Sequence, residues 1–226
     1  MPTLKAAQRR SRLTPYCCQR SAMAQAANGG PVAAVVSPML TVEEAFLFAK
    51  FIKGLSAEDQ RTQLIDTGYV MPHWPKPYGR QADAIEQLVI EQEFGAAGIK
   101  RPSLGITTWV ILTLVQHATE DQVARWVRPA LTAEVVWCQL FSEPDAGSDA
   151  VGIKTKATRV DGGWLINGQK VWTSGAHLAK YGLATVRTNP DVPKHSGITT
   201  MVIDMEADGV EVRPLKMPTG QSEFNE

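Results

Sequence analysis

The hydrophobic pattern of this chain changes its period once, near Pro129, and that change narrows the folds open to it. Before Pro129, apolar residues recur at the three- and four-residue spacing of amphipathic helices. After it, they gather in short β-branched runs separated by Gly, Pro, Asn and Asp. This order predicts an α+β fold with two domains: a helical bundle at residues 41–131 and an all-β domain, spaced like a small barrel or sandwich, at residues 132–226.

Capping signals place the first helices. Thr41 with Glu44, and Thr119 with Gln122, each form a capping box, because the two side chains satisfy backbone amides left free in the first turn. Ser56 should cap a further helix in the same way. These signals all lie before Pro129, which supports a helical first half.

Two more helices are expected in this half. A helix that begins at Ala82 should bury one face, made of Ile85, Leu88, Val89 and Gln92. Residues 104–115 are apolar on all sides, as in a helix in the middle of a bundle. The first half should therefore pack as a bundle.

Turn residues place the strands of the second half. Asp161, Gly162 and Gly163 separate two apolar runs, and Gly tolerates the positive φ that a hairpin turn requires. The expected strands are residues 135–141, 155–160, 164–166, 183–188, 198–205 and 210–213.

Composition and charge exclude several classes of protein. Lys plus Arg and Asp plus Glu number 23 each, so the zero formal net charge gives no support for nucleic-acid binding. The most apolar stretch, residues 106–115, is about half the roughly 20 residues of a bilayer span, so no membrane span is expected. The four histidines are too scattered for a metal site, and three cysteines form no disulfide framework. We expect a globular protein in a reducing compartment, the cytoplasm.

The first 40 residues differ from the rest of the chain. Residues 1–42 carry five basic side chains and no acidic one, and Gly29, Gly30 and Pro31 interrupt any helix. One interpretation is a flexible or non-native extension, produced by a translation start upstream of the natural one. The alternative is an organelle transit peptide, which would place the protein in the mitochondrial matrix.

Two segments carry the remaining chemistry. A predicted strand ends at Phe141 and Ser142 and leads into a loop of small and polar residues, 143–149. Later in the chain, residues 168–175 place the indole of Trp172 beside two hydroxyls. A flat, polar heteroaromatic cofactor needs an aromatic wall for its face and hydrogen-bonding groups for its edge. On composition alone, a buried core tryptophan next to an ordinary turn is favoured over such a site.

These segments resemble the acyl-CoA dehydrogenase family. WCQLFSEPDAGSD at residues 137–149 is similar to the family signature, and NGQKVWTSGAH at residues 167–177 is similar to its second flavin segment. The resemblance extends from about Gly68 to Glu226. It implies a helical N-terminal domain, a middle β-barrel domain and a C-terminal four-helix domain, with FAD held between the last two. Residues 132–226 would then be an incomplete middle β-barrel.

The resemblance also implies roles for individual residues. The implied cofactor-binding residues are Gln139, Phe141, Ser142, Ser148, Trp172, Thr173 and Ser174. The strand end would meet the flavin, with Ser142 bonding its pyrimidine edge. Trp172 would pack against the isoalloxazine, and Ser174 would donate near its reactive nitrogen. Ser148 would also lie beside the acyl-CoA thioester or its pantetheine arm, and Glu143 is expected to be structural rather than basic.

The implied activity is the FAD-dependent α,β-desaturation of an acyl-CoA thioester to trans-2-enoyl-CoA. The catalytic glutamate of the family is expected beyond Glu226, so this chain alone is expected to be inactive. The implied partners are an acyl-CoA, including bulky or steroid-side-chain thioesters, an electron-transfer flavoprotein or similar acceptor, and further dehydrogenase subunits in a homo- or hetero-oligomer.

Two alternatives stay open. The chain could be an inactive remnant, or a non-catalytic interaction subunit of a dehydrogenase complex that binds no flavin. It could also be an all-β binding module with a helical cap, if the two motifs arose by chance. Binding of FAD separates these alternatives from the dehydrogenase.

Overall fold

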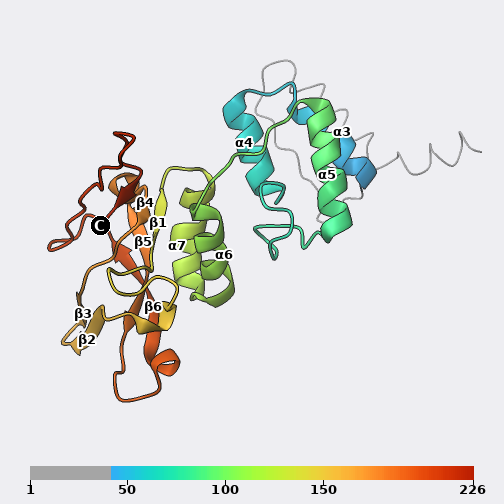
Figure 1. The fold of residues 1–226 in the computed structure, drawn as a ribbon. Helices are drawn as coiled ribbons and strands as arrows, with labels where there is room; N and C mark the ends of the chain where they lie inside the picture. The colour runs from blue at the N-terminus through green and yellow to red at the C-terminus, as the bar shows by residue number, and fades with distance from the viewer. Residues whose placement is uncertain (1–41) are drawn as a thin grey trace, which may run out of the picture. The chain divides into compact units, whose positions relative to one another are not determined.

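The computed structural model describes residues 42–226, which form parts of two compact units (Figure 1). One unit ends at Arg101 and the other begins at Pro102. The sequence predicts a boundary between residues 131 and 132, whereas the two helices before that point pack with the second unit. The domain boundaries at residues 41–131 and 132–226 stay a prediction. The extension proposed for residues 1–40 lies outside the described residues.

The first unit, in its described part, contains the helices α3 (Val42–Ile52), α4 (Ala57–Asp66) and α5 (Ala84–Ala97). Ser56 caps α4 as predicted, since its hydroxyl accepts a hydrogen bond from the Asp59 amide. Asp83 caps α5 in a capping box with Glu86, which was not predicted. The capping box expected at Thr41 and Glu44 involves side chains outside the described part of the chain.

The buried face of α5 differs from the predicted one. Ile85 and Leu88 are 73% and 59% exposed, so the prediction that they are buried is wrong. The buried residues include Ile90 and Phe94, which lie on another face of the helix. Because α5 is apolar on more than one side, packing decides which side is buried. The Phe94 ring packs against the buried ring of Tyr69, with centroids 5.2 Å apart.

In the second unit, α6 (Thr107–His117) and α7 (Glu120–Leu131) lie side by side next to the sheet (Figure 1). The capping box predicted at Thr119 and Gln122 is confirmed, because each side chain accepts a hydrogen bond from the other residue's amide. The apolar helix predicted to begin at residue 104 begins three residues later, after Gly105. α6 thus packs against β1, the strand of the main sheet that leads into the first motif segment, and α7 packs against α6.

The main sheet of the second unit contains β1 (Trp137–Leu140), β2 (Lys156–Val160), β3 (Gly163–Asn167), β5 (Tyr181–Arg187) and β6 (Ile198–Asp204). The strand order is β1-β5-β2-β3, and β6 also pairs with β5. β1 and β5 are parallel, whereas β5 and β6 are antiparallel. The predicted hairpin is confirmed: β2 and β3 pair around a turn in which Gly162 has a φ of +81°. The predicted α+β fold is therefore confirmed.

Two parts of this unit differ from the predicted strands. Residues 210–213 do not form a strand, so that prediction is wrong. Instead, two short strands that were not predicted, β4 (Thr173–Ser174) and β7 (Phe224–Asn225), pair antiparallel. A strand of two residues is too short to show the alternating pattern of a strand, and β4 and β7 lie far apart in the chain, so the sequence did not predict them. Their pairing brings the last residues against the second motif segment.

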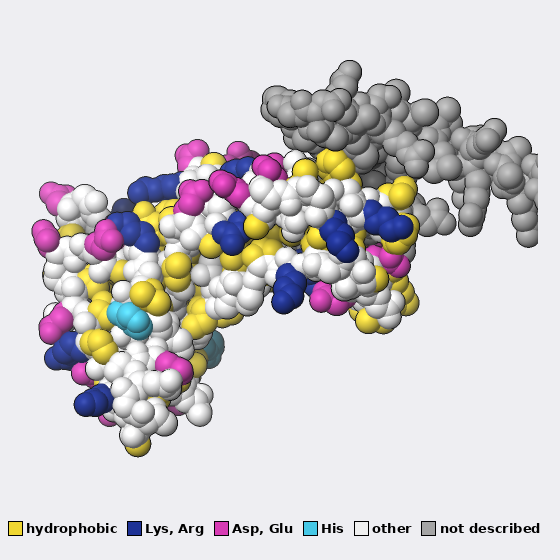
Figure 2. Space-filling view, turned by 90° about the horizontal axis from the view of Figure 1, so that it is seen from above, with side chains coloured by type: hydrophobic (Ala, Val, Ile, Leu, Met, Phe, Trp, Pro, Cys, Tyr) yellow, Lys and Arg dark blue, Asp and Glu magenta, His cyan; other side chains and the backbone are white. Residues whose placement is uncertain are grey.

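Charged side chains of both signs are mixed on the surface. On the face seen in Figure 2, Lys and Arg side chains are interspersed with Asp and Glu side chains. This mixing agrees with the zero formal net charge. Within residues 42–226, every helix is too short or too polar to serve as a membrane span.

Candidate functional site

The two segments that the sequence singles out lie side by side in the second unit. The Val171 amide donates to the Ser142 carbonyl oxygen at 2.9 Å. The Nζ of Lys170 donates to the Phe141 carbonyl oxygen at 3.0 Å. The end of β1 is therefore joined to the residues that lead into Trp172, although the β2–β3 hairpin separates them along the chain.

A buried ion pair lies at this junction. The Nζ of Lys170 and the Oε1 of Glu143 are 2.8 Å apart, and the two side chains are 10% and 6% exposed. The Nζ of Lys170 also donates to the Thr185 carbonyl oxygen of β5 at 2.7 Å. The Glu143 carboxylate accepts hydrogen bonds from the amides of Lys154, at 2.6 Å, and Thr155, at 3.0 Å. Both charges are thus paired and hydrogen-bonded, as burial requires.

These surroundings shift the pKa of both partners. Burial alone would raise the pKa of Glu143, but hydrogen bonds from Lys170 and from the two backbone amides outweigh it and hold the pKa below its ordinary value. Burial lowers the pKa of Lys170, and the Glu143 carboxylate opposes part of that shift. A carboxylate with a lowered pKa and occupied oxygens is poorly suited to remove a proton. The structure thus agrees with a structural role for Glu143.

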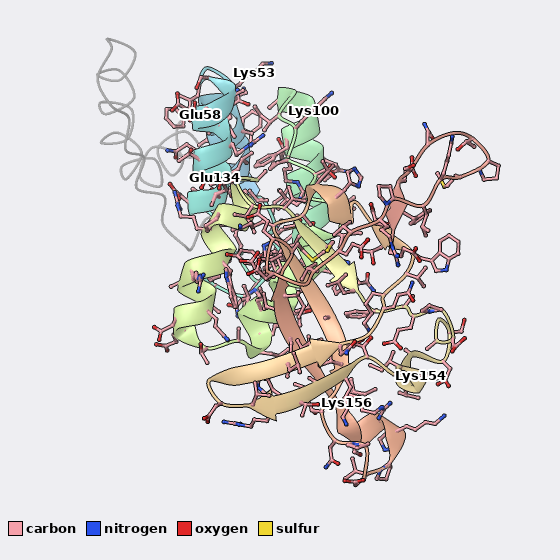
Figure 3. All side chains as sticks on the ribbon, turned by 90° about the vertical axis from the view of Figure 1, so that its left-hand side faces the viewer. Lys53, Glu58, Lys100, Glu134, Lys154 and Lys156 are labelled. Atoms are coloured by element: carbon pink, nitrogen blue, oxygen red, sulfur yellow. The ribbon has the colours of Figure 1, made fainter. Side chains whose placement is uncertain are left out.

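Beyond Glu143, the same motif opens into an exposed turn. Glu143 and Ala146 exchange backbone hydrogen bonds of 2.8 and 3.1 Å, which close the turn around Asp145. Lys154 lies on a surface loop, as Figure 3 shows, and forms an exposed ion pair with Asp145. Ser148, predicted to contact the thioester or pantetheine arm, is exposed. It is therefore open to a ligand that approaches from solvent.

Trp172 is held out to solvent in a strained backbone conformation. Its φ is +60°, in the left-handed region that bulky residues rarely adopt, and the residue is 62% exposed. Both neighbours, Val171 and Thr173, are buried. The rings of Trp172 and Phe224 lie nearly perpendicular to each other, with centroids 6.0 Å apart. The core position favoured by composition is therefore wrong, and a strained, exposed aromatic residue is typical of a functional site.

The last residues of the chain anchor the segment that carries Trp172. Asn225 is wholly buried, and its Nδ2 donates to the Thr173 carbonyl oxygen at 3.0 Å. Its Oδ1 lies 3.1 Å from the Nδ1 of His177. The Gly175 amide donates to the Glu223 carbonyl oxygen at 3.0 Å. Residues on both sides of Trp172 are therefore fixed, which keeps its unusual conformation in place.

Both joined segments carry hydroxyl groups: Thr173 and Ser174 follow Trp172, and Ser142 stands at the end of β1. Ser174 is half-buried, as is Ser142 at the end of β1. Among residues 42–226, neither of these two hydroxyls has a hydrogen-bond partner. The Oγ1 of Thr173 is also without a partner, and it is buried. The two joined segments thus carry polar groups without a partner among the described residues, as well as an exposed aromatic residue.

The remaining predicted residues lie on β1 and just after it. Gln139 is half-buried within β1, and β1 packs against β4. The ring of Phe141 meets Trp109 of α6 edge-on, with centroids 5.6 Å apart. The Phe141 ring is therefore part of the packing between the strand end and α6, which leaves main-chain groups as its means of contact with a ligand.

Three residues of this site were not predicted: Lys170, Phe224 and Asn225. Lys170 stands inside the second motif, but nothing in its neighbours distinguishes a buried lysine from one on the surface. The one available signal was its place directly before the apolar pair of Val171 and Trp172. The roles of Phe224 and Asn225 depend on contacts with residues far away in the chain.

A hollow of about 560 Å³ lies between α6, α7 and one face of the main sheet. Its lining combines the rings of Trp126 and Trp164 with His117 and the hydroxyls of Thr199 and Thr200. None of the predicted site residues lines it. The candidate site is therefore the junction of the two motif segments.

Two family models and several curated relatives match the sequence of this chain. The chain matches the family model of the acyl-CoA dehydrogenase N-terminal domain over residues 52–134 and that of the middle domain over residues 138–225. It is 51% identical over 175 residues to acyl-CoA dehydrogenase FadE34 of Mycobacterium tuberculosis, which covers 77% of this chain and 25% of that protein. It is 39% identical over 124 residues to acyl-CoA dehydrogenase IpdE1 of Mycolicibacterium smegmatis, covering 50% of this chain and 32% of that protein.

Solved structures of acyl-CoA dehydrogenases also match this chain. A steroid ACAD, Tcur3481-Tcur3483, matches with a TM-score of 0.59 and 29% identity, over 83% of this chain and 49% of that one. The ChsE4-ChsE5 complex from Mycobacterium tuberculosis matches with a TM-score of 0.60 and 25% identity, over 85% of this chain and 54% of that one. The chain thus spans about half the length of these solved relatives. It belongs to the acyl-CoA dehydrogenase family.

Proposed function

We propose that this chain contributes the flavin-binding face of an FAD-dependent acyl-CoA dehydrogenase, which desaturates an acyl-CoA thioester between its α and β carbons. The observation that carries the proposal is the presentation of Trp172. Trp172 is 62% exposed on a strained backbone, and the hydroxyls that follow it in the chain, those of Thr173 and Ser174, have no partner among the described residues. The family to which the chain belongs supports the same cofactor.

The residues present fit a flavin. An isoalloxazine has a flat face that stacks on an aromatic ring and a polar edge that accepts and donates hydrogen bonds. Trp172 offers the ring, while Ser142 and Ser174 offer free hydroxyls. The buried, unpaired Oγ1 of Thr173 lies between Trp172 and Ser174 in the chain. An orphaned buried hydroxyl is costly unless a ligand or water satisfies it, which supports a ligand at this place.

Each residue has a role in this proposal. Bound FAD supplies the acceptor for the hydride that leaves the β carbon. Trp172 would hold one face of the cofactor and exclude water there, and Ser142 would fix its edge. Ser174 would donate a hydrogen bond where negative charge grows, which stabilises the reduced cofactor. Gln139 and the main chain at Phe141 would complete the contact along the strand end.

The exposed turn would meet the substrate. Ser148 is proposed to contact the acyl-CoA thioester or its pantetheine arm, because it is accessible from solvent on a loop next to the strand end. The α-proton requires a separate base. Glu143 is not that base in this proposal, since its oxygens accept three hydrogen bonds. The family glutamate would instead come from outside the two matched domains.

The relatives suggest the class of substrate and the assembly. One solved relative is described as a steroid ACAD and another as a complex of two proteins. We propose, on that basis, a bulky or steroid-side-chain thioester as substrate and an assembly with further dehydrogenase subunits. An electron-transfer flavoprotein or similar acceptor would reoxidise the cofactor. The cytoplasmic location stays a prediction.

Titration of the 226-residue chain with FAD tests the proposal, with flavin fluorescence as the readout. We expect saturable binding that Trp172→Ala weakens by about fivefold or more, because stacking on one exposed ring is worth about 1 kcal/mol or more. Trp164→Ala is the matched control, since Trp164 is also an exposed tryptophan but lies on β3. Ser174→Ala should weaken binding less than Trp172→Ala.

Two results would contradict the proposal. The first is that FAD does not bind to the chain even when the family's C-terminal domain is supplied, which would favour the remnant or interaction subunit. The second is that Trp172→Ala and Trp164→Ala change the affinity equally, which would place the cofactor elsewhere.

A further inference from the structure

The ammonium group of Lys170 has no proton left for a ligand. A lysine ammonium carries three N–H donors. In the structure they are directed to three oxygens: the Phe141 carbonyl at 3.0 Å, the Glu143 carboxylate at 2.8 Å and the Thr185 carbonyl at 2.7 Å. Lys170 therefore cannot donate to a cofactor or to a substrate without breaking a bond inside the protein.

The Glu143 carboxylate is occupied in the same way. Its Oε1 accepts from Lys170 and from the Thr155 amide, and its Oε2 accepts from the Lys154 amide. These amides lie just before β2. The pair therefore joins four pieces of chain: the end of β1, the approach to β2, the approach to Trp172, and β5.

Close packing of the backbone fixes the surroundings of the Lys170–Glu143 ion pair. A Cβ added to Gly168 would lie 2.6 Å from the Cα of Thr155, so only glycine fits there. The backbone before Lys170 is therefore pressed against the residue whose amide binds Glu143. We call the Lys170 and Glu143 side chains, with the oxygens and amides that they bond, the clasp.

We infer that the clasp positions the proposed flavin-binding face: Lys170 and Glu143 hold Ser142 and Trp172 in their relative places without touching the cofactor. This inference rests on the proposed function. Trp172 needs such support, because a strained φ persists only where the surroundings fix it. The support begins at Val171, whose amide is bonded to the Ser142 carbonyl next to the clasp. Lys170 and Glu143 are thus positioning residues.

Lys170→Met tests the inference in the 226-residue chain, because methionine keeps much of the length and removes the charge. We expect faster hydrogen exchange at the Val171 amide and a Kd for FAD raised by about tenfold, by analogy with the lower end of the loss seen when a residue that orients a metal ligand is removed. Lys154→Met is the matched control, since its ion pair is also 2.8 Å long but exposed. It should change neither quantity.

A second control separates positioning from stability. Val127→Ala removes volume from a buried site on α7 and should destabilise the second unit without contacting the clasp. The folded Val127→Ala protein should bind FAD as the parent does. If it loses as much affinity as Lys170→Met, the effect is one of stability and the inference is overturned.

A double variant and the parent protein cover the case in which Lys170→Met does not fold. Glu143→Gln combined with Lys170→Met removes both charges together, so no unpaired charge is buried, and the same two readouts are expected to change. In the parent, the amides of Lys154, Thr155 and Val171 should report one common opening equilibrium. Three different equilibria would overturn the inference.

The exchange measurements require no FAD, so they separate two kinds of failure. If the parent does not bind FAD even with the family's C-terminal domain supplied, but the three amides open together, the clasp exists and the proposed function fails. If FAD binds and Lys170→Met leaves its affinity and the Val171 exchange rate unchanged, the positioning role is wrong and the proposed function stands.

Discussion

Two lysine–carboxylate pairs in the first motif and its surroundings have the same length and opposite environments. Lys170 with Glu143 and Lys154 with Asp145 are each 2.8 Å apart. The side chains of the first pair are 10% and 6% exposed, whereas those of the second are 74% and 72% exposed. The first belongs to the clasp, and the second flanks the exposed turn at residues 145–149.

The comparison shows that one motif contributes to two kinds of ion pair, one buried and one solvated. In the clasp, every charge is out of water and depends on its partners, so removal of one partner leaves a buried charge unpaired. At the turn, water solvates each charge whether or not its partner is present. The clasp is suited to hold geometry, and the turn is suited to meet a ligand. The following changes test that division.

The largest effect is expected from Lys170→Met. The substitution leaves the Glu143 carboxylate buried without its ammonium partner, and breaking a buried pair in this way costs about 3–5 kcal/mol. Urea unfolding at neutral pH measures the loss. The double variant Glu143→Gln and Lys170→Met should recover part of the stability. A loss below about 1 kcal/mol for the single change would show that the pair behaves as a surface pair.

Two glycines provide the next test. Gly168→Ala forces a methyl group against Thr155, and overpacking of this kind costs about 1–3 kcal/mol. Gly147→Ala is the matched control in the exposed turn, where an added Cβ meets nothing within 4 Å. Its unfolding midpoint in urea should stay near that of the parent. Equal losses in the two variants would contradict the difference in packing between the clasp and the turn.

Acid should weaken the clasp. The pKa of Glu143 lies below its ordinary value of 4.5, so the folded state binds this proton less readily than the unfolded state does. The contribution of the ionised Glu143 to the free energy of unfolding is present above pH 4.5 and is lost as the pH falls through the lowered pKa. Lys170 stays charged over this range. Unfolding in urea at a series of acid pH values should show a shallower decline for Glu143→Gln than for the parent. Parallel declines would contradict this role of Glu143.

The smallest effect is expected from Lys154→Met. Both members of its ion pair are mainly exposed, and the contact of Lys154 with Glu143 is made by its backbone amide, which the substitution keeps. The unfolding midpoint in urea should equal that of the parent within experimental error. A shift as large as that of Lys170→Met would mean that distance, rather than burial, decides the strength of these pairs.

Features that depend on neighbouring residues could be predicted from the sequence. The capping box at Thr119 and Gln122 and the hairpin at Gly162 each require only a few adjacent residues. The buried face of α5 could not be predicted, because Ile85 and Ile90 are both apolar and the choice depends on what the helix packs against. Local signals thus give the elements, and tertiary contacts decide their orientation.

The same distinction applies to the site. The two motifs identify Trp172 and Ser142 as candidates through resemblance, and the structure reveals how exposed Trp172 is. The burial of Lys170 could not be predicted, because two separate pieces of chain, the end of β1 and β5, supply its acceptors. The pairing of Asn225 with Thr173 is likewise a contact between distant residues. The supports of the site are therefore the part that needs a structure.

The most direct test of the central claim is amide hydrogen exchange of the 226-residue chain with and without saturating FAD. If the junction of the two segments binds the cofactor, protection should increase in residues 139–143 and 170–175. The β2–β3 hairpin, residues 156–167, should exchange as before. Protection confined to other parts of the chain, or none at all, would contradict the claim that these two segments form a flavin-binding face.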